Sequence, residues 1–159
     1  MKNYKTILFE KNQRIATVWL NRPEVLNAFN SLMLTEIIDC FNEISLFDDI
    51  RIVIIRGKGK AFCSGADLNW MKNVADYSFQ QNYDESLIVS KCFEAIYKCP
   101  KPTIAFIHGA AIGGANGFIT PCDYAIAENN TKFSLSEVKI GIVPACISPY
   151  LYKRMGEYH

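Results

Sequence analysis

Apolar and polar residues alternate along two short segments near the N-terminus. Residues 6–9 (TILF) and 14–20 (RIATVWL) are predicted to be strands. The polar EKNQ segment between them is predicted to be the turn that joins the two strands into a hairpin. Pro23, in the NRPE segment that follows, ends the pattern because proline cannot donate a hydrogen bond to a strand ladder.

A helical spacing of apolar residues comes next along the chain. Ser31 is the expected N-cap, since its hydroxyl can accept a hydrogen bond from a free N–H group in the first turn. The residues behind it that share one helical face are Leu34, Ile37, Ile38, Phe41 and Ile44. This spacing predicts an amphipathic helix packed on a core.

Short apolar runs then alternate with helical stretches over the rest of the chain. The predicted buried strands are residues 51–57 and 103–109, a further strand is predicted at residues 123–127, and the predicted helices are residues 85–98 and 113–120. The polar segment 72–84 between them is interpreted as a loop or an irregular helix. This order is typical of an α/β fold with largely parallel strands.

Length and charge narrow the class of protein. The chain has 159 residues, half of them apolar, and a formal net charge of +1, which fits one globular domain. Such a balanced charge argues against a nucleic-acid binder that works by bulk positive charge. No apolar run is long enough to span a bilayer, and the N-terminus lacks the pattern of a secretion signal, so we expect a cytoplasmic protein.

The cysteine and histidine pattern does not favour a metal site. The six cysteines are scattered, without a C-x-x-C pair, at positions 40, 63, 92, 99, 122 and 146. Only His108 and His159 could assist them, so neither a zinc site nor a disulfide framework is favoured. We interpret the cysteines as free, mostly buried thiols and the lone His108 as a packing or hydrogen-bonding residue.

Two glycine-bearing turns follow predicted strands: AFCSGADL at 61–68 and HGAAIGGANG at 108–117. A helix that starts at such a turn leaves free N–H groups at its first residues, and these favour negative charge. The expected helix starts are near Asp67 and near Gly113 and Gly114. Two turns of this kind that face each other can hold one oxygen atom between two N–H donors, as an oxyanion hole does.

Other interpretations of these turns are weaker. A Walker loop needs a lysine after its glycines, and GGANGF has none. A dinucleotide-binding turn needs G-x-G-x-x-G, and GAAIGGANG has a different spacing. Each glycine run taken alone is better explained by close packing of a helix on a strand. Asp67 has a structural interpretation too, as the cap of the helix that starts there.

The two turns together resemble the enoyl-CoA hydratase/isomerase family, the crotonases. The resemblance rests on AFCSGADL, HGAAIGGANG and CDYAIA, in that order, and extends to TVWLNRPEVLNAFN at 17–30 and FSLSEVKIGIVP at 133–144. It covers almost the whole chain. Within the family, GGANGFITPCD and LSEVKIGIVPACISPY are most similar to bacterial methylglutaconyl-CoA hydratases.

This resemblance implies the fold, the substrate class and the assembly. The implied fold is a spiral of repeated β-β-α units, and residues 1–159 would be its single N-terminal core, with a further C-terminal helical region in typical members. Members bind acyl-CoA thioesters, so coenzyme A enters as part of the substrate and no separate cofactor or metal is expected. They assemble as trimers or pairs of trimers, with no nucleic acid or membrane as partner.

The resemblance also implies roles for named residues. The N–H groups of Ala66 and Gly114 would hold the thioester oxygen, and the residues expected to contact the CoA thioester are Ser64, Ala66, Asp67, Leu68 and Gly114. Glu137 would be the acid/base residue. Gly117 stands where hydratases of the family commonly have a second glutamate. A carboxylate on a branched glutaconyl substrate would take over part of its role, and this is a hypothesis.

The function expected on this basis is hydration of an enoyl-CoA, with 3-methylglutaconyl-CoA or a related branched glutaconyl-CoA as substrate. Two alternatives remain open: an enoyl-CoA isomerase on the same scaffold, which needs only one glutamate, and a truncated, non-catalytic form that binds CoA or a partner. The basic cluster Arg56, Lys58 and Lys60 is interpreted as a solvated hairpin end, with contact to CoA phosphates as the alternative. Trp70 and Met71 would line the acyl pocket or belong to the core.

Overall fold

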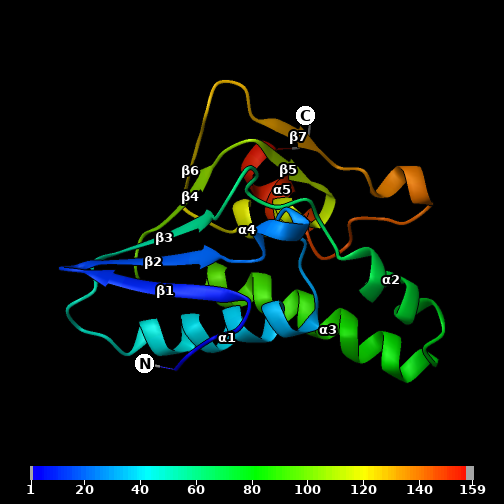
Figure 1. Ribbon diagram of the computed structural model, residues 1–159, viewed down its shortest axis with the longest axis horizontal. Coiled ribbons are helices and arrows are strands. Elements are labelled where there is room, and N and C mark those ends of the chain that lie inside the picture. Colours follow the sequence, from blue (N-terminus) through cyan, green and yellow to red (C-terminus); the bar gives the residue numbers. More distant parts are fainter. Residues whose placement is uncertain (1, 157–159) are drawn as a thin grey trace.

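The computed structural model describes residues 2–156, apart from the side chain of Ile140 (Figure 1). Its strands are β1 (Ile7–Asn12), β2 (Ile15–Leu20), β3 (Ile52–Gly57), β4 (Thr103–Ile107), β5 (Ala110–Ile112), β6 (Tyr124–Ala127) and β7 (Lys132–Ser134). Its α-helices are α1 (Ser31–Ser45), α2 (Leu68–Ala75), α3 (Phe79–Tyr97), α4 (Asn116–Ile119) and α5 (Ser148–Met155). Short 3-10 helices are η1 (Pro23–Val25), η2 (Gly113–Ala115) and η3 (Glu137–Ile140).

Five strands form one sheet in the order β1-β2-β3-β4-β6, and β5 and β7 form a second, two-stranded sheet. Only the β1–β2 pair is antiparallel, and the other named pairs are parallel, so the predicted α/β class with largely parallel strands is confirmed. The predicted position of the hairpin turn is wrong. Asn12 pairs with Ile15, and the turn is made by Gln13 and Arg14 alone, because the left-handed backbone of Gln13 (φ 52°) reverses the chain within two residues.

The chain winds as a spiral of repeated β-β-α units, as the resemblance implies. Each turn of the spiral places one strand in the large sheet (β3, then β4, then β6) and a second extended segment in the layer of β5, namely Cys63, β5 itself and β7. In the turn after β3 this second segment is Cys63, which forms a parallel bridge with Ala111 of β5. The spiral therefore brings the ends of successive units together at the two glycine-bearing turns.

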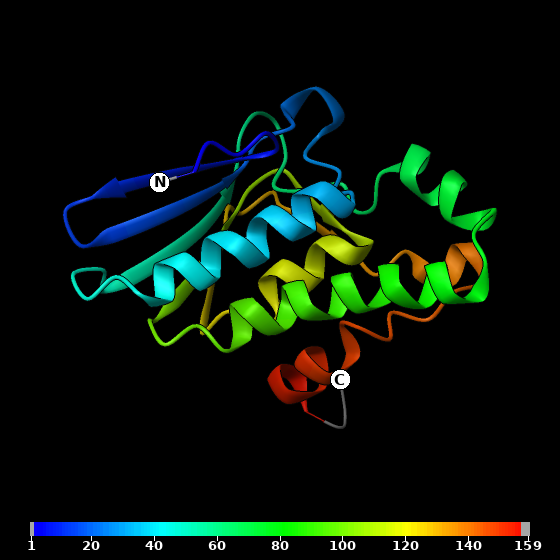
Figure 2. The same cartoon turned by 90° about the horizontal axis from the view of Figure 1, so that it is seen from below.

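Helices α1 and α3 run side by side across one face of the large sheet (Figure 2). Alternate residues of the central strands point into this layer and are fully buried, among them Val18, Val53 and Ala105. Phe41 of α1 and Phe93 of α3 fill the space between the layers and are also fully buried. Burial of each such aromatic side chain stabilises the fold by roughly 1.5–3 kcal/mol.

Helix α1 begins as expected but has a different cap. The side chain of Asn30 accepts a hydrogen bond from the Met33 N–H group (3.0 Å), so Asn30 is the N-cap and Ser31 is the first helical residue. Asparagine and serine cap helices about equally well, and the sequence pattern does not choose between neighbours. The hydroxyl of Ser31 donates instead to Glu85 of α3 (3.3 Å).

The segment 72–84, predicted to be a loop or an irregular helix, is helical on both sides of a short connection at residues 76–78. It contains the end of α2 and the start of α3, and the two helices project together from the sheet (Figure 1). Ser78 starts α3 with a capping box that it shares with Gln81. Helix α2 spans only 8 residues and buries none of its side chains fully, although its apolar residues Trp70, Met71 and Val74 lie at helical spacing and are half-buried.

Candidate active site

The first glycine-bearing turn packs directly against the end of β5. The Cys63 N–H group donates to the Ala110 carbonyl (3.1 Å), and the Ile112 N–H group donates to the Cys63 carbonyl (3.1 Å). Gly65 has a φ of +100°, and a Cβ atom at this position would lie 2.7 Å from the Ile112 carbonyl oxygen. Glycine is therefore required here both by its backbone conformation and by the close approach of β5.

Phe29 connects this turn to the second one. Its N–H group donates to the Gly65 carbonyl (2.9 Å), and its carbonyl accepts from the Asp67 N–H group (2.8 Å). The Ala66 N–H group lies between these two bonds and points away from Phe29, since successive amides of an extended segment face opposite sides. The Phe29 ring fills the space beside Gly114, where a Cβ atom would lie 2.6 Å from its Cζ atom.

The amides predicted to hold the thioester oxygen are available for a ligand. Gly114 is the second residue of η2, where N–H groups have no partner inside the helix. Among the hydrogen bonds that residues 2–156 form outside their own helices and strands, neither the Ala66 nor the Gly114 N–H group is a donor. Both turns lie against Phe29 and β5, so the structure brings these residues into one region.

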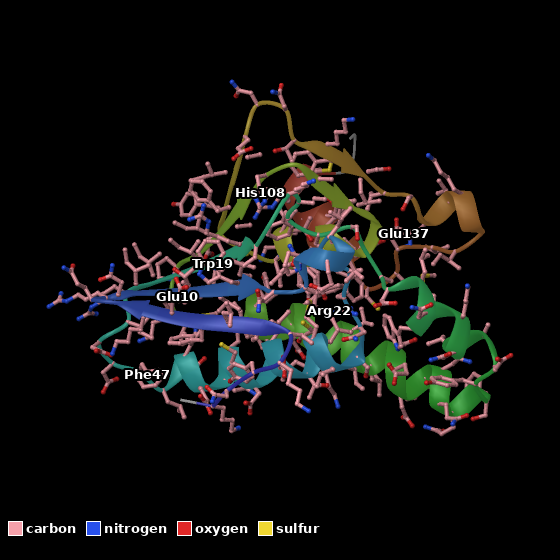
Figure 3. All side chains as sticks on the ribbon, in the orientation of Figure 1. Glu10, Trp19, Arg22, Phe47, His108 and Glu137 are labelled. Carbon is pink, nitrogen blue, oxygen red and sulfur yellow. The ribbon has the colours of Figure 1, made fainter. Side chains whose placement is uncertain are left out.

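Glu137 is brought to the second turn from a distant part of the sequence. It is the first residue of η3, which follows β7, and β7 pairs with β5 through Ser134 and Ile112. A Cβ atom on Gly113 would lie 3.4 Å from the Glu137 Oε1 atom, so the carboxyl group packs against the Gly113 backbone. Figure 3 shows Glu137 on the side of the molecule where η3 lies.

The carboxyl group of Glu137 is buried without a full set of partners. The residue is only 8% exposed, and its Oε2 atom has no hydrogen-bond partner among the described residues. Burial of an unpaired carboxylate destabilises a fold, so a purely structural role for Glu137 is disfavoured. An oxygen with a free lone pair next to the Gly113 turn is suited to accept a proton from a bound molecule.

Asp67 caps α2, as one of its two interpretations predicts. Its Oδ1 atom accepts hydrogen bonds from the Asn69 and Trp70 N–H groups (2.9 and 3.4 Å), and its Oδ2 atom pairs with Arg22 Nη2 (2.8 Å). Burial opposes ionisation of this carboxyl, but the bonds from Arg22 and the two amides outweigh it, and the pKa of Asp67 lies below its ordinary value. The Arg22–Asp67 ion pair thus holds the 21–30 segment against the first glycine-bearing turn, directly after Ala66.

Replacement of Asp67 by asparagine is expected to destabilise the protein by about 2 kcal/mol near neutral pH, because the Arg22 guanidinium loses its charged partner. Asparagine still caps α2, so the loss reports the ion pair. The lowered pKa means that ionised Asp67 stabilises the fold above the pKa of unfolded aspartate, about 3.9, and that this contribution disappears as the pH falls through the folded-state pKa.

Urea unfolding of both proteins at about pH 7 and about pH 3 measures this difference. The difference in the free energy of unfolding between the unchanged protein and Asp67→Asn should be smaller at the lower pH. Asp39→Asn is the control, since Asp39 pairs with Lys2 (2.7 Å) and accepts a hydrogen bond from the Tyr4 hydroxyl (3.1 Å) but is more exposed than Asp67, and such ion pairs contribute little. An equal effect of the two substitutions at neutral pH would contradict the role assigned to Arg22.

Gly117 is in close contact with α3. A Cβ atom at this position would lie 2.5 Å from the Phe93 Cε1 atom and closer still to Cζ and Cε2. The Phe93 ring is fully buried and packs edge-on against Phe118, which packs in the same way against Phe29. The Phe93 ring thus fills the space that a glutamate side chain at position 117 would need. This contact between Phe93 and Gly117 was not predicted from the sequence.

The other residues of the first turn differ in exposure. The Ser64 hydroxyl donates to the Val25 carbonyl (3.2 Å), and Leu68 is 74% exposed at the start of α2. Trp70 packs edge-on against Phe29 and donates to Glu85 (3.2 Å), so it borders the same region. The contact of Ser64 and Leu68 with CoA stays a prediction.

The basic cluster lies elsewhere. Arg56 is stacked between the rings of Trp19 and Phe106 (4.6 and 5.0 Å to the centroids), and Lys58 lies over Trp19 (3.6 Å). His108 bonds to the Gly59 carbonyl (2.9 Å). Figure 3 shows Trp19 and His108 well apart from Glu137. This favours a structural role for Arg56, Lys58 and His108.

The cysteines are free thiols, and Cys63 of the first turn has no nucleophilic character. Burial raises its pKa to about 12, and its Sγ atom accepts a hydrogen bond from the Gly65 N–H group (3.4 Å). Among residues 2–156, no group of His, Cys, Asp and Glu is arranged to hold a metal ion. No helix within the same range is both long and apolar enough to cross a bilayer.

Comparison with known proteins agrees with this geometry. The sequence pattern of the enoyl-CoA hydratase/isomerase family matches residues 10–159. A crotonyl-CoA hydratase of Syntrophomonas wolfei is 35% identical, over 89% of this chain and 54% of that protein. The mitochondrial Δ3,5-Δ2,4-dienoyl-CoA isomerase of Mus musculus is 36% identical, over 88% of this chain and 46% of that protein.

The fold matches solved structures closely. The crystal structure of an enoyl-CoA hydratase from Shewanella pealeana superimposes with a TM-score of 0.93 at 38% identity, covering 96% of this chain and 58% of that one. The chain thus spans about half the length of the curated relatives it matches. On the family pattern and the shared fold, the chain belongs to the enoyl-CoA hydratase/isomerase family.

Proposed function

We propose that this protein adds water across the α,β double bond of an enoyl-CoA, with 3-methylglutaconyl-CoA or a related branched glutaconyl-CoA as the substrate. The observation that carries the proposal is the buried Oε2 atom of Glu137, which has no partner among the described residues and belongs to a carboxyl group packed on the Gly113 turn. Membership of the family supports an enoyl-CoA thioester as the substrate class.

The amides of Ala66 and Gly114 would stabilise the charge that develops on the thioester oxygen. Their hydrogen bonds polarise the carbonyl and make the β-carbon electrophilic. The turns that carry the two donors pack on Phe29 and β5, which supports a preformed site. Loss of one such donor typically raises the barrier by roughly 3–4 kcal/mol.

Glu137 would act as the base and then as the acid. Water adds its oxygen to the β-carbon while Glu137 accepts one of its protons, and the π electrons of the double bond move onto the thioester as an enolate. Glu137 then returns the proton to the α-carbon. The product is the 3-hydroxyacyl thioester, and the carboxylate is regenerated.

A glutaconyl-CoA is proposed as the substrate because the chain has Gly117 where hydratases of the family commonly have a second glutamate. Phe93 fills the space beside Gly117, so this site has no room for a glutamate there. A substrate with its own carboxylate would supply the second group that orients water. We infer that glutaconyl thioesters react faster than a plain crotonyl thioester for this reason.

Steady-state kinetics with 3-methylglutaconyl-CoA and crotonyl-CoA test this proposal, with mass analysis of the products. The expected result is a 3-hydroxyacyl thioester and a higher kcat/KM for the glutaconyl substrate. Equal values for the two substrates would remove the reason for a substrate carboxylate. No hydroxyacyl product from either would overturn hydration itself.

Isomerisation is the second candidate, because a single carboxylate is enough to move a proton between two carbons. The dienoyl-CoA isomerase relative shows that the family includes this reaction. A product with the mass of the substrate and a shifted double bond would favour it. For the whole protein we further propose the trimeric or hexameric assembly that the family resemblance implies.

A further inference from the structure

Asn116 makes two hydrogen bonds that the proposed reaction does not use. It is the first residue of α4 and only 9% exposed. Its Nδ2 atom donates to the Gly113 carbonyl (2.9 Å) and to the Ser134 carbonyl of β7 (3.0 Å). Both partners are acceptors, so they use both protons of the amide group and fix its orientation.

The Gly113 carbonyl belongs to the same peptide unit as the Gly114 N–H group. A peptide unit is planar, and its C=O and N–H bonds point in opposite directions, so a hydrogen bond that holds the Gly113 carbonyl also sets the direction of the Gly114 N–H. Gly113 has a φ of +55° and no side chain to restrict its backbone. The Asn116 backbone N–H group also donates to the Gly113 carbonyl, so the side-chain bond adds to this bond of the short helix.

We infer that Asn116 is a positioning residue that aims the Gly114 N–H group at the thioester oxygen, an inference that rests on the proposed function. A hydrogen bond donated to the carbonyl end also polarises the peptide and strengthens the N–H donor at its other end. The second bond, to Ser134, joins this peptide to the strand that leads to Glu137 three residues later. Asn116 thus couples the position of the oxyanion donor to that of the acid/base residue.

The chemistry of the site favours an amide over other side chains. The substitution Asn116→Asp keeps the shape of the side chain but sets a carboxylate, which only accepts hydrogen bonds, against two carbonyl oxygens. The Gly113 peptide is then expected to rotate away. Asn116→Ala leaves both carbonyls without this donor but adds no repulsion, and alanine is a good helix former, so it is the milder change.

Kinetics of the two variants give the first test. We expect Asn116→Asp to lower kcat for hydration by about tenfold to hundredfold, less than the loss of a whole donor, while KM changes by less than about threefold. Asn116→Ala should show a smaller loss of the same kind. Thr120→Val is the matched control, because Thr120 bonds to the Asn116 carbonyl (2.9 Å) within α4 without touching Gly113.

Infrared spectroscopy can distinguish an effect on the direction of the Gly114 N–H group from an effect on the stability of the protein. The ligand is crotonyl-CoA labelled with carbon-13 at the thioester carbonyl. The measurement uses a Glu137→Gln background, in which turnover is blocked, at saturating ligand. A polarised carbonyl absorbs at lower frequency than in solution. The band should move back toward the solution value when Asn116→Asp or Asn116→Ala is added, and should not move with Thr120→Val.

The outcomes distinguish the inference from the proposed function. A bound carbonyl with no shift in Glu137→Gln alone would overturn the oxyanion hole and the function with it. A normal shift there that persists in both Asn116 variants would overturn only the role of Asn116. Near-ultraviolet circular dichroism identifies any variant that is misfolded, and the alanine variant provides the result if the aspartate variant fails to fold.

Discussion

Replacement of Glu137 by glutamine is expected to lower kcat for hydration by about 10²–10⁴-fold, the range that general acid–base groups contribute. Glutamine keeps the shape of the side chain but cannot accept the proton that water loses. Binding of the CoA thioester should persist, because the Ala66 and Gly114 turns are unchanged. The measurement is steady-state kinetics, with the affinity for the thioester determined separately.

The same substitution carries a second expectation on stability. Glu137 is buried and its Oε2 atom lacks a partner within the described part of the chain, so removal of the charge relieves a desolvation cost. The free energy of unfolding should therefore stay equal or rise while activity falls, as at residues whose strain serves function. Unchanged turnover would contradict the assignment of Glu137, and lower stability with lower turnover would indicate a structural role.

An exposed glutamate provides the control for this experiment. Glu128 lies in the loop between β6 and β7 and is exposed. Glu128→Gln removes the same charge from the protein without a change in the site. Its kcat and its free energy of unfolding should match those of the unchanged protein.

The strands of the fold were largely predictable, because each carries a dense local signal. The runs RIVIIRG and TIAFIHG are apolar and end in glycine, and the structure confirms strands there as β3 and β4, whereas the short strands β5 and β7 were not predicted. The elements that were misjudged lack such a signal. Helix α2 spans only 8 residues, too few for a long helical pattern, and the cap of α1 shifts by one residue because Asn30 and Ser31 are equally suited.

The candidate site was only partly accessible to sequence reasoning. The glycine-bearing turns stand out locally, and in the structure the first turn packs against β5, which leads into the second turn. The ion pair of Arg22 with Asp67 and the contact of Phe93 with Gly117 each join residues far apart in sequence. Such contacts depend on how the spiral stacks its units, and no local pattern encodes that. The proposed role of Asn116 could not be predicted from the sequence either, because it depends on the orientation of the peptide unit between Gly113 and Gly114.

Gly117→Glu is expected to destabilise the protein by roughly 3 kcal/mol or more, although it restores the residue that hydratases of the family commonly have. The first carbon of the new side chain would overlap the Phe93 ring, and the rest would place a charge in the core. We therefore expect that a second carboxylate cannot be added at position 117 by one substitution while the Phe93 ring stays in place.

A double-mutant cycle tests this coupling, with urea unfolding of the parent, Gly117→Glu, Phe93→Ala and the combined variant. Phe93→Ala alone should cost about 3–5 kcal/mol, because it leaves a cavity beside Phe118. In the combined variant the glutamate enters that cavity, so the total loss should be smaller than the sum of the two single losses by about 1–3 kcal/mol. Additive losses would mean that the Phe93 ring is not what excludes a side chain at position 117.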